Sequence, residues 1–197
     1  MSNVLDKFVM NDRTVLITGA AGLLGRQFAL ALGQAGANVM LADLAGEAVR
    51  AYANQLKVQG IPAGVVEVDV TDPDSVQHMV TATLERFASL DALINSAALD
   101  PKFDPAHVDA QGANAFESYS LDAWRQALDV NLTGMFLASQ AAVKPMLKKG
   151  GGVIVNICST YGLNGPDQRI YERPDGSRSF KPTYYSVTKA GVLGFTK

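Results

Sequence analysis

The segment TYYSVTK, residues 183–189, places a lysine shortly after two adjacent tyrosines. Residues four apart on a helix differ by about 40° in direction and share a face, whereas residues five apart diverge. Tyr185 is therefore expected beside Lys189, and Tyr184 is expected to pack or to line a pocket. An ammonium group near a phenol favours the phenolate form, which makes Tyr185 a candidate acid/base. The same pair also arises by chance on exposed helices, so the other motifs must decide between the two interpretations.

The segment TGAAGLLG, residues 18–25, follows an apolar stretch and precedes an amphipathic one. Gly19, Gly22 and Gly25 would allow a tight turn and a close backbone approach to a pyrophosphate, which the N-terminus of the next helix would bind. The strand–glycine–helix context favours a dinucleotide site over a glycine-rich turn without a ligand.

Asp43 ends the next apolar stretch, and no lysine or arginine lies within six residues of it. A carboxylate at this place can accept hydrogen bonds from a ribose 2′-OH and would repel a 2′-phosphate. The sequence thus predicts NAD rather than NADP. Asp43 could also cap the following helix, and both roles are compatible.

Strand-length apolar segments alternate with helix-length amphipathic ones along the chain. The expected strands are 13–18, 38–43, 64–70, 91–97 and 152–158. The expected helices are 24–36, 46–59, 73–88, 120–149 and one from 183, with Asp72 and Pro73 as a helix start. This alternation predicts an α/β fold, a doubly wound Rossmann-type parallel sheet with helices on both faces, in a single domain over residues 1–197.

Two long irregular segments, 99–119 and 161–182, follow the fourth and fifth expected strands. Ligands bind at the carboxyl ends of strands in such sheets, so these segments are expected over the active site. Surface insertions without a function are the alternative.

The bulk composition excludes several classes of protein. The 197 residues are 48% hydrophobic, carry a net charge of −2 and include one cysteine. These values give no reason to expect nucleic acid, a membrane or a disulfide, and they favour a cytoplasmic globular protein. His78 and His107 have no ligand spacing, so no metal is expected.

Five motifs in a fixed order resemble the short-chain dehydrogenase/reductase family from Arg13 to Lys197. They are DVTD, NSAA in place of the family's NNAG, DVNLTG, NICS in place of Asn-Ile-Ser-Ser, and YSVTK. The resemblance implies that the catalytic residues are Asn131, Ser159, Tyr185 and Lys189. It implies that NAD contacts Thr18, Gly19, Gly22, Leu24, Gly25, Asp43, Asp69, Val70, Asn95, Ala97, Tyr185 and Lys189.

The resemblance also implies an activity, which is alcohol–carbonyl interconversion by hydride transfer. Tyr185 would exchange a proton with the substrate oxygen, Ser159 would polarise that oxygen, and Lys189 would stabilise the phenolate and bind ribose. Asn131 would hold a water in the proton relay, although a backbone bond at a helix bend is an alternative. Ser159 could instead be a plain turn residue, and Cys158 is expected in the core. The family commonly forms homodimers or homotetramers through the helices that correspond to 120–149 and 183 onward.

Three departures from the family pattern define the alternatives. The glycine spacing and the separation of Ser159 from Tyr185 are typical of the extended branch, which holds nucleotide-sugar epimerases and dehydratases. The other motifs favour the short branch with an insertion at 161–182, and a sugar-like small-molecule substrate is one expectation. The chain ends at Lys197 within a helix, so a C-terminally incomplete chain is expected. A non-catalytic dinucleotide-binding module is the third alternative.

Overall fold

The computed structural model of the chain describes residues 3–100, 114–174, 176 and 178–197. The described residues form two compact units. The first unit comprises Met1–Ala97 and Gly134–Asn156, and the second comprises Ala98–Thr133 and Ile157–Lys197.

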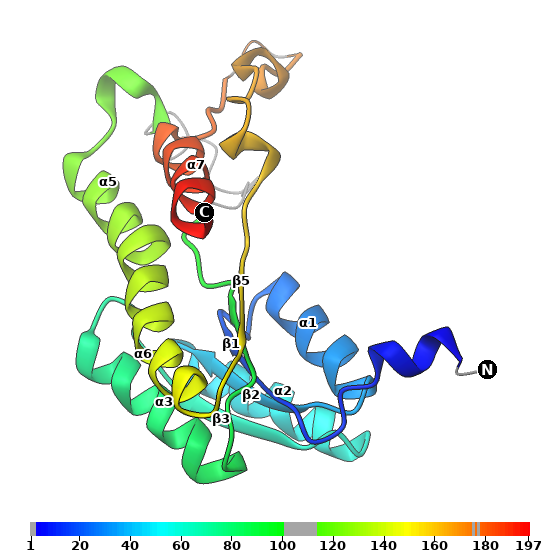
Figure 1. Cartoon of the computed structure of the whole chain (residues 1–197). Coiled ribbons are helices and arrows are strands. Elements are labelled where there is room, and N and C mark those ends of the chain that lie inside the picture. The colour runs from blue at the N-terminus through cyan, green and yellow to red at the C-terminus, as the bar shows by residue number, and fades with distance from the viewer. Residues whose placement is uncertain (1–2, 101–113, 175, 177) are drawn as a thin grey trace. The chain divides into compact units, whose positions relative to one another are not determined.

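The first unit is built on a parallel sheet with helices on both faces (Figure 1). Its five strands have the order β3-β2-β1-β4-β5. They are β1 (Thr14–Thr18), β2 (Asn38–Asp43), β3 (Ala63–Glu67), β4 (Ala92–Asn95) and β5 (Val153–Asn156). Helices α1 (Leu23–Gln34) and α2 (Gly46–Val58) pack together on one face, and α3 (Pro73–Phe87) and α6 (Gly134–Lys148) pack together on the other. A short 3-10 helix, Val4–Phe8, precedes β1.

The burial of the strands explains why the sheet forms here. All five residues of β1 are buried, as expected for a nearly continuous apolar strand that is covered on both faces. Helix α3 begins as predicted, because the Asp72 side chain accepts a hydrogen bond of 3.0 Å from the backbone N–H of Asp74 and Pro73 occupies the first helical position. The predicted doubly wound α/β fold is confirmed, although β3, β4 and β5 end two or three residues earlier than predicted.

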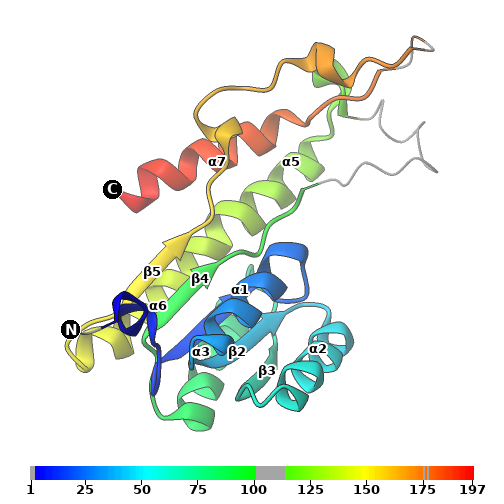
Figure 2. The same cartoon turned by 90° about the vertical axis from the view of Figure 1, so that its right-hand side faces the viewer.

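The strand register brings the candidate site residues of this unit to one edge of the sheet. Thr18, at the end of β1, lies opposite Ala42 and Asn95, and Asn95 lies opposite Asn156. Strands β4 and β5 run side by side in the same direction (Figure 2). The carboxyl ends of β1 and β4 are neighbours, and this is the switch point of the strand order at which open α/β sheets bind ligands.

The second unit is helical, and α5 (Leu121–Leu128) packs against α7 (Thr183–Thr196). Its shorter elements are a π-helix at Asp129–Thr133 and 3-10 helices at Phe116–Ser118, Thr160–Gly162 and Gln168–Tyr171. The single helix predicted over 120–149 is thus interrupted by a π-turn. Residues 101–113 of the long segment 99–119, and His107 with them, lie outside the described residues.

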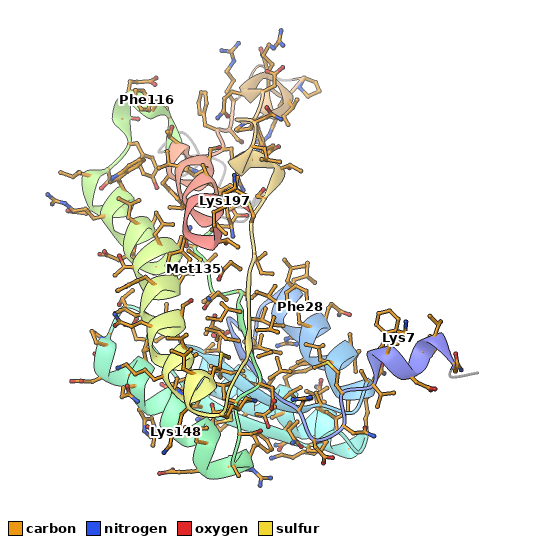
Figure 3. The ribbon with its side chains drawn as sticks, viewed as in Figure 1. Lys7, Phe28, Phe116, Met135, Lys148 and Lys197 are labelled. Carbon is orange, nitrogen blue, oxygen red and sulfur yellow. The ribbon has the colours of Figure 1, made fainter. Side chains whose placement is uncertain are left out.

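Side chains on these elements are shown in Figure 3, among them buried Met135 of the first unit and exposed Phe116 of the second. In the part of the chain that the structure describes, no helix is long and apolar enough to span a membrane. The same residues contain no cluster of three metal-ligating side chains.

Candidate active site

The turn between β1 and α1 has a backbone that requires glycine. Gly19 has a φ of 68°, and a Cβ at this residue would lie 2.7 Å from the backbone nitrogen of Ala97. A Cβ at Gly25 would lie 2.3 Å from the carbonyl oxygen of Gly19. Gly22 caps α1 without a side-chain hydrogen bond, and Leu24 in the first turn is half exposed. The turn therefore fits the pyrophosphate of a dinucleotide, which free N–H groups at a helix N-terminus can bind.

Arg26, which the sequence motifs do not single out, supports this turn. Its Nε donates a hydrogen bond of 2.9 Å to the carbonyl oxygen of Ala21, and its guanidinium lies 5.1 Å from the ring centroid of Tyr52. The Tyr52 hydroxyl in turn donates to the carbonyl oxygen of Arg26 at 2.6 Å. The only sequence signal was a cation in the first turn of α1.

Asp43 lies at the end of β2 and is hydrogen-bonded to both neighbouring turns. Its Oδ2 accepts from the backbone N–H of Ala21 at 2.8 Å, and its Oδ1 accepts from that of Ala45 at 2.9 Å. The carboxylate thus fixes the glycine turn and the start of α2 at once. The N-cap of α2 is Ala45 and this helix has no side-chain cap, so the predicted capping role of Asp43 is wrong. The carboxylate stands at the strand end where a ribose would bind.

Asp69 and Val70, after β3, differ in exposure. Asp69 is exposed, and hydrogen bonds from the side chain and then the backbone of Thr71 hold the pKa of its carboxyl below the usual value. Val70 is 8% exposed and packs so closely on α6 that a Cβ at Gly134 would lie 2.7 Å from its Cγ2. Contacts of both residues with adenine stay a prediction.

The remaining predicted residues of the first unit fix the ends of the strands. The Thr18 hydroxyl is buried and accepts a hydrogen bond of 3.2 Å from the backbone N–H of Ala97. Asn95 donates from Nδ2 to Ser139 Oγ at 2.9 Å and to Asn156 Oδ1 at 2.8 Å. These bonds shape the edge of the sheet beside the glycine turn. Asn156 opens the NICS motif but was given no role from the sequence, and Ser139 lies in none of the motifs.

Tyr185 and Lys189 lie on α7, one helical turn apart. Lys189 is 7% exposed, and its Nζ donates a hydrogen bond of 2.6 Å to the carbonyl oxygen of Ile157 and lies 5.8 Å from the ring centroid of Tyr185. Burial lowers the pKa of Lys189, and the charge of Lys181 acts in the same direction. The predicted neighbourhood of the phenol and the ammonium group is therefore present.

Ser159 is held beside α7 by the 3-10 helix that follows it. Its Oγ accepts a hydrogen bond of 3.2 Å from the backbone N–H of Tyr161, which leaves the hydroxyl hydrogen available for another acceptor. The turn lies tightly on α7, since a Cβ at Gly162 would lie 2.5 Å from the carbonyl oxygen of Lys189. Cys158 is half-buried, not in the core as expected, because β5 ends two residues earlier; its Sγ lies 3.2 Å from the same oxygen.

Asn131 lies in the π-helix and is buried. Its Oδ1 accepts from the backbone N–H of Leu99 at 2.7 Å, and its Nδ2 donates to the Leu99 carbonyl at 3.1 Å and to Thr188 Oγ1 at 3.2 Å. The backbone bonds at an irregular helix turn match the alternative role considered for this residue, and a water relay stays a prediction. Through Thr188, the side chain also ties the π-helix to α7 next to Lys189.

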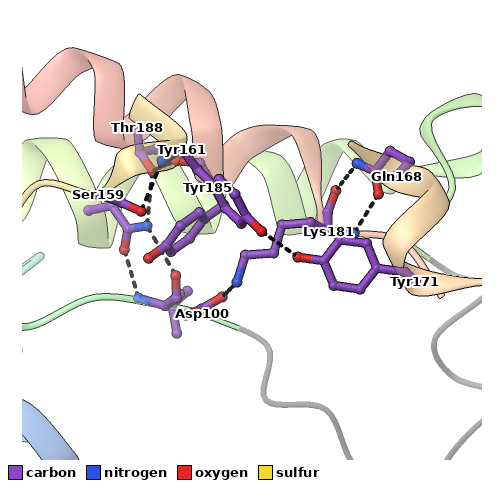
Figure 4. Close-up of polar contacts among 10 residues, drawn as sticks. Asp100, Ser159, Tyr161, Gln168, Tyr171, Lys181, Tyr185 and Thr188 are labelled. Carbon is purple, nitrogen blue, oxygen red and sulfur yellow. Dashed lines mark hydrogen bonds and ion pairs between the residues drawn. The ribbon is translucent and has the colours of Figure 1, made fainter. Parts of the chain in front are cut away.

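Further groups around Tyr185 come from the insertion and, for Asp100, from the segment 99–119, and none was predicted individually (Figure 4). Lys181 forms an ion pair with Asp100, and its Nζ lies 4.0 Å from the ring centroid of Tyr185. The Tyr161 and Tyr171 hydroxyls lie 3.2 Å apart, in hydrogen-bond contact. All of these residues belong to the second unit.

Comparison with known proteins gives a consistent result. A family model described as "short chain dehydrogenase" matches residues 13–197. The chain is 36% identical to trans-4-hydroxycyclohexanecarboxylate dehydrogenase of Sinomonas cyclohexanicum, over 100% of this chain and 68% of the relative. It is 32% identical to 3-oxoacyl-[acyl-carrier-protein] reductase of Synechocystis, over 95% of this chain and 67% of that protein.

Solved structures agree with these relatives. A short-chain type dehydrogenase/reductase from Mycobacterium marinum has a TM-score of 0.84 at 28% identity, over 99% of this chain and 70% of its own. NAD+-bound xylitol dehydrogenase has a TM-score of 0.78 at 26% identity, over 95% of this chain and 63% of its own. The chain spans between 61% and 70% of the length of such relatives. The chain belongs to the short-chain dehydrogenase family, a family of oxidoreductases.

Proposed function

We propose that the chain is part of an NAD(H)-dependent oxidoreductase that interconverts an alcohol and a carbonyl compound by hydride transfer. The observation that carries the proposal is the arrangement of the second unit. There the 3-10 helix after Ser159 and the π-helix with Asn131 both pack on α7, the helix that carries Tyr185 and Lys189. In this family the bound nicotinamide supplies the hydride acceptor or donor.

The residues of the chain would handle the proton. Tyr185 would take the proton of a substrate alcohol, or give one to a carbonyl, as a general base or acid. The Ser159 hydroxyl would donate a hydrogen bond to the same oxygen, since its Oγ accepts from the backbone N–H of Tyr161 and its hydrogen stays available. The ammonium group of Lys189 would stabilise the phenolate form.

The preference for NAD rests on Asp43. Its negative charge would lie beside the 2′-position of the adenosine ribose, where it accepts hydrogen bonds from NAD and repels the extra phosphate of NADP. One structural neighbour, xylitol dehydrogenase, is described as NAD+-bound, which supports the same cofactor for this chain. A small polyol or sugar-like alcohol remains our proposal for the substrate class.

The experiment compares Tyr185→Phe with Tyr184→Phe in the full-length protein. Each change removes one hydroxyl, but only the first removes the proposed acid/base. We expect Tyr185→Phe to lower turnover at least about 100-fold in a panel of alcohols, ketones and sugars, with NADH affinity in calorimetric titration unchanged. Tyr184→Phe should retain turnover. An active Tyr185→Phe variant, or a folded protein that binds neither NADH nor NADPH, would contradict the proposal.

A further inference from the structure

A second lysine lies closer to Tyr185 than the one on its own helix. The Nζ of Lys181 is 4.0 Å from the ring centroid of Tyr185, compared with 5.8 Å for Lys189. The Lys181 side chain is only 15% exposed, and Figure 4 shows it extending past the tyrosine rings to Asp100. An ammonium group within about 6 Å of an aromatic ring centroid is attracted by the π electrons.

Both ends of Lys181 are fixed. Its ammonium group pairs with Asp100, and its backbone N–H and carbonyl are both bonded to the side-chain amide of Gln168, at 3.0 and 2.9 Å. Pro182, the next residue, caps α7. A lysine at the end of a long insertion would ordinarily extend into solvent, because holding it costs side-chain entropy. Here the ion pair with Asp100, the two hydrogen bonds with Gln168 and the start of α7 at Pro182 hold the Lys181 side chain against the ring of Tyr185.

In the part of the chain that the structure describes, the charged groups nearest Tyr185 are those of Lys181, its partner Asp100 and Lys189. Tyr171 stays neutral near physiological pH, because burial first, and then the hydrogen bond with Tyr161, raise the pKa of Tyr171 to about 12. The two lysines affect each other, since Lys181 contributes to the lowered pKa of Lys189. Among the residues that the structure describes, the titratable groups that face Tyr185 or its immediate neighbours are Asp100, Tyr119, Cys158, Tyr161, Tyr171, Lys181, Tyr184 and Lys189.

We propose that Lys181, held by Asp100, is a positioning residue that orients the ring of Tyr185 and supplies a second positive charge for its phenolate form. The inference rests on the proposed role of Tyr185. A neutral phenol attracts an ammonium group only through its ring quadrupole, whereas a phenolate attracts it by a full charge. The proposed contact involves a residue of the insertion that the general family motif does not contain.

The test is the pH dependence of kcat for alcohol oxidation by the full-length protein with NAD+. Removing the charge in Lys181→Met should move the acid limb of the profile to higher pH by about 0.5 to 1 unit, because the phenolate loses a nearby cation. Lys181→Arg should restore the wild-type limb. The double variant Asp100→Asn/Lys181→Met should shift less than Lys181→Met alone, since it also removes the carboxylate that is left without its partner.

The matched control is Arg169→Gln, which removes a cation of the same insertion that pairs with Asp167. It should leave the limb in place. A second readout, which needs no substrate, is the ultraviolet absorbance of tyrosinate as a function of pH. The difference between each variant with and without Tyr185→Phe gives the signal of Tyr185. Lys181→Gln provides a second uncharged side chain at position 181.

The outcomes separate this inference from the proposed function. If the acid limb of the kcat profile stays in place in folded Lys181→Met and Lys181→Gln, the inference is overturned. The proposed function would still stand in that case, provided that Tyr185→Phe is inactive. A raised KM with an unmoved limb would mean that Lys181 contacts the substrate instead, and it would also overturn the inference. A shift in Lys181→Arg equal to that in Lys181→Met would contradict the role of charge.

Discussion

The two adjacent tyrosines of α7 have opposite environments. Tyr184 is 3% exposed and its ring lies 5.9 Å from that of Tyr119, centroid to centroid. Burial, followed by the neighbouring Tyr119, Asp100 and Tyr185, raises the pKa of Tyr184 well above that of an ordinary tyrosine, which keeps it neutral. Tyr185 is half-buried and lies near two ammonium groups. Adjacent residues on a helix point about 100° apart, and this difference in direction separates a packing side chain from a candidate acid/base.

Also at the scale of a single residue, the charge of Asp43 can be tested apart from its shape. Asp43→Asn keeps the size of the side chain and one of the two hydrogen bonds that the carboxylate accepts from Ala21 and Ala45. Losing the negative charge should reduce the preference for NADH over NADPH by about tenfold, because the repulsion of the 2′-phosphate disappears. Calorimetric titration with each cofactor measures this ratio.

Leu44→Ala is the control for Asp43→Asn, since it changes an exposed neighbour without changing charge. It should leave the preference as it is. An unchanged ratio in Asp43→Asn would mean that the carboxylate only holds the two turns.

At the scale of elements, Asn131 links the π-helix to Leu99 and to α7. The buried amide satisfies both backbone groups of Leu99 and contacts Thr188 on α7. Asn131→Ala should therefore lower the free energy of unfolding by about 2 kcal/mol, because buried backbone groups lose their partners. Urea denaturation followed by circular dichroism measures the loss. Thr133→Ala, an exposed change in the same π-helix, should cost less than about 0.5 kcal/mol.

If Asn131→Ala lost activity but kept the stability of the wild type, the water-relay role would be favoured over the backbone role. If it lost stability as expected, the role of this side chain as the partner of the Leu99 backbone groups would be supported.

The sequence predicted the elements whose signals are local. Apolar strand segments and the Asp72–Pro73 start of α3 were predictable because burial on both faces and helix capping leave marks in neighbouring residues. The π-turn was not predicted, since the contacts that Asn131 makes there are with residues distant in sequence. The positions of Lys181 and Arg26 were unpredictable for the same reason, because a cation in a loop or first helical turn usually faces solvent.

A carboxylate at the amino end of the sheet gives the first unit a pH-dependent stability. Burial disfavours the charged form of Asp91, but hydrogen bonds from Lys149, the backbone of Thr14, Arg13 and Ser89 together hold its pKa well below the ordinary value. A carboxyl with a lowered folded-state pKa stabilises the fold fully above its unfolded-state pKa, about 3.9. The contribution is lost as the pH falls from there through the lowered folded-state value.

Asp91→Asn should accordingly cost about 2 kcal/mol of unfolding free energy at pH 7, and this difference from the wild type should shrink below about pH 4. Urea denaturation at several pH values measures both. Asp74→Asn, in the first turn of α3, is the control. A cost for Asp91→Asn that is constant from pH 7 to pH 3 would show that the carboxylate acts by its shape rather than its charge.

On the scale of the whole molecule, the functional residues divide between the two units. The glycine turn, Asp43 and Asp69 belong to the first unit, whereas Asn131 and the side chains around Tyr185 belong to the second. Variants of the first set therefore test the proposed cofactor binding, and variants of the second test the proposed proton transfer together with the ribose contact expected of Lys189. The single-domain organisation and the homo-oligomer stay predictions.

The expected oligomer can be tested on the surface of α7. Val187, Ala190 and Gly194 are exposed at a spacing that places them on one face, and a Cβ at Gly194 would meet nothing within 4 Å. An uncharged, small-residue face of this kind suits close packing against a second helix, and it lies on one of the helices through which the family is expected to pair.

We expect the full-length protein to be a homodimer or homotetramer by size-exclusion chromatography with light scattering. Ala190→Arg should reduce the measured mass by placing a charge in the contact, whereas Gln55→Arg on the exposed side of α2 should not. A wild-type monomer at micromolar concentration, or an Ala190→Arg variant with the wild-type mass, would rule out this face as the interface.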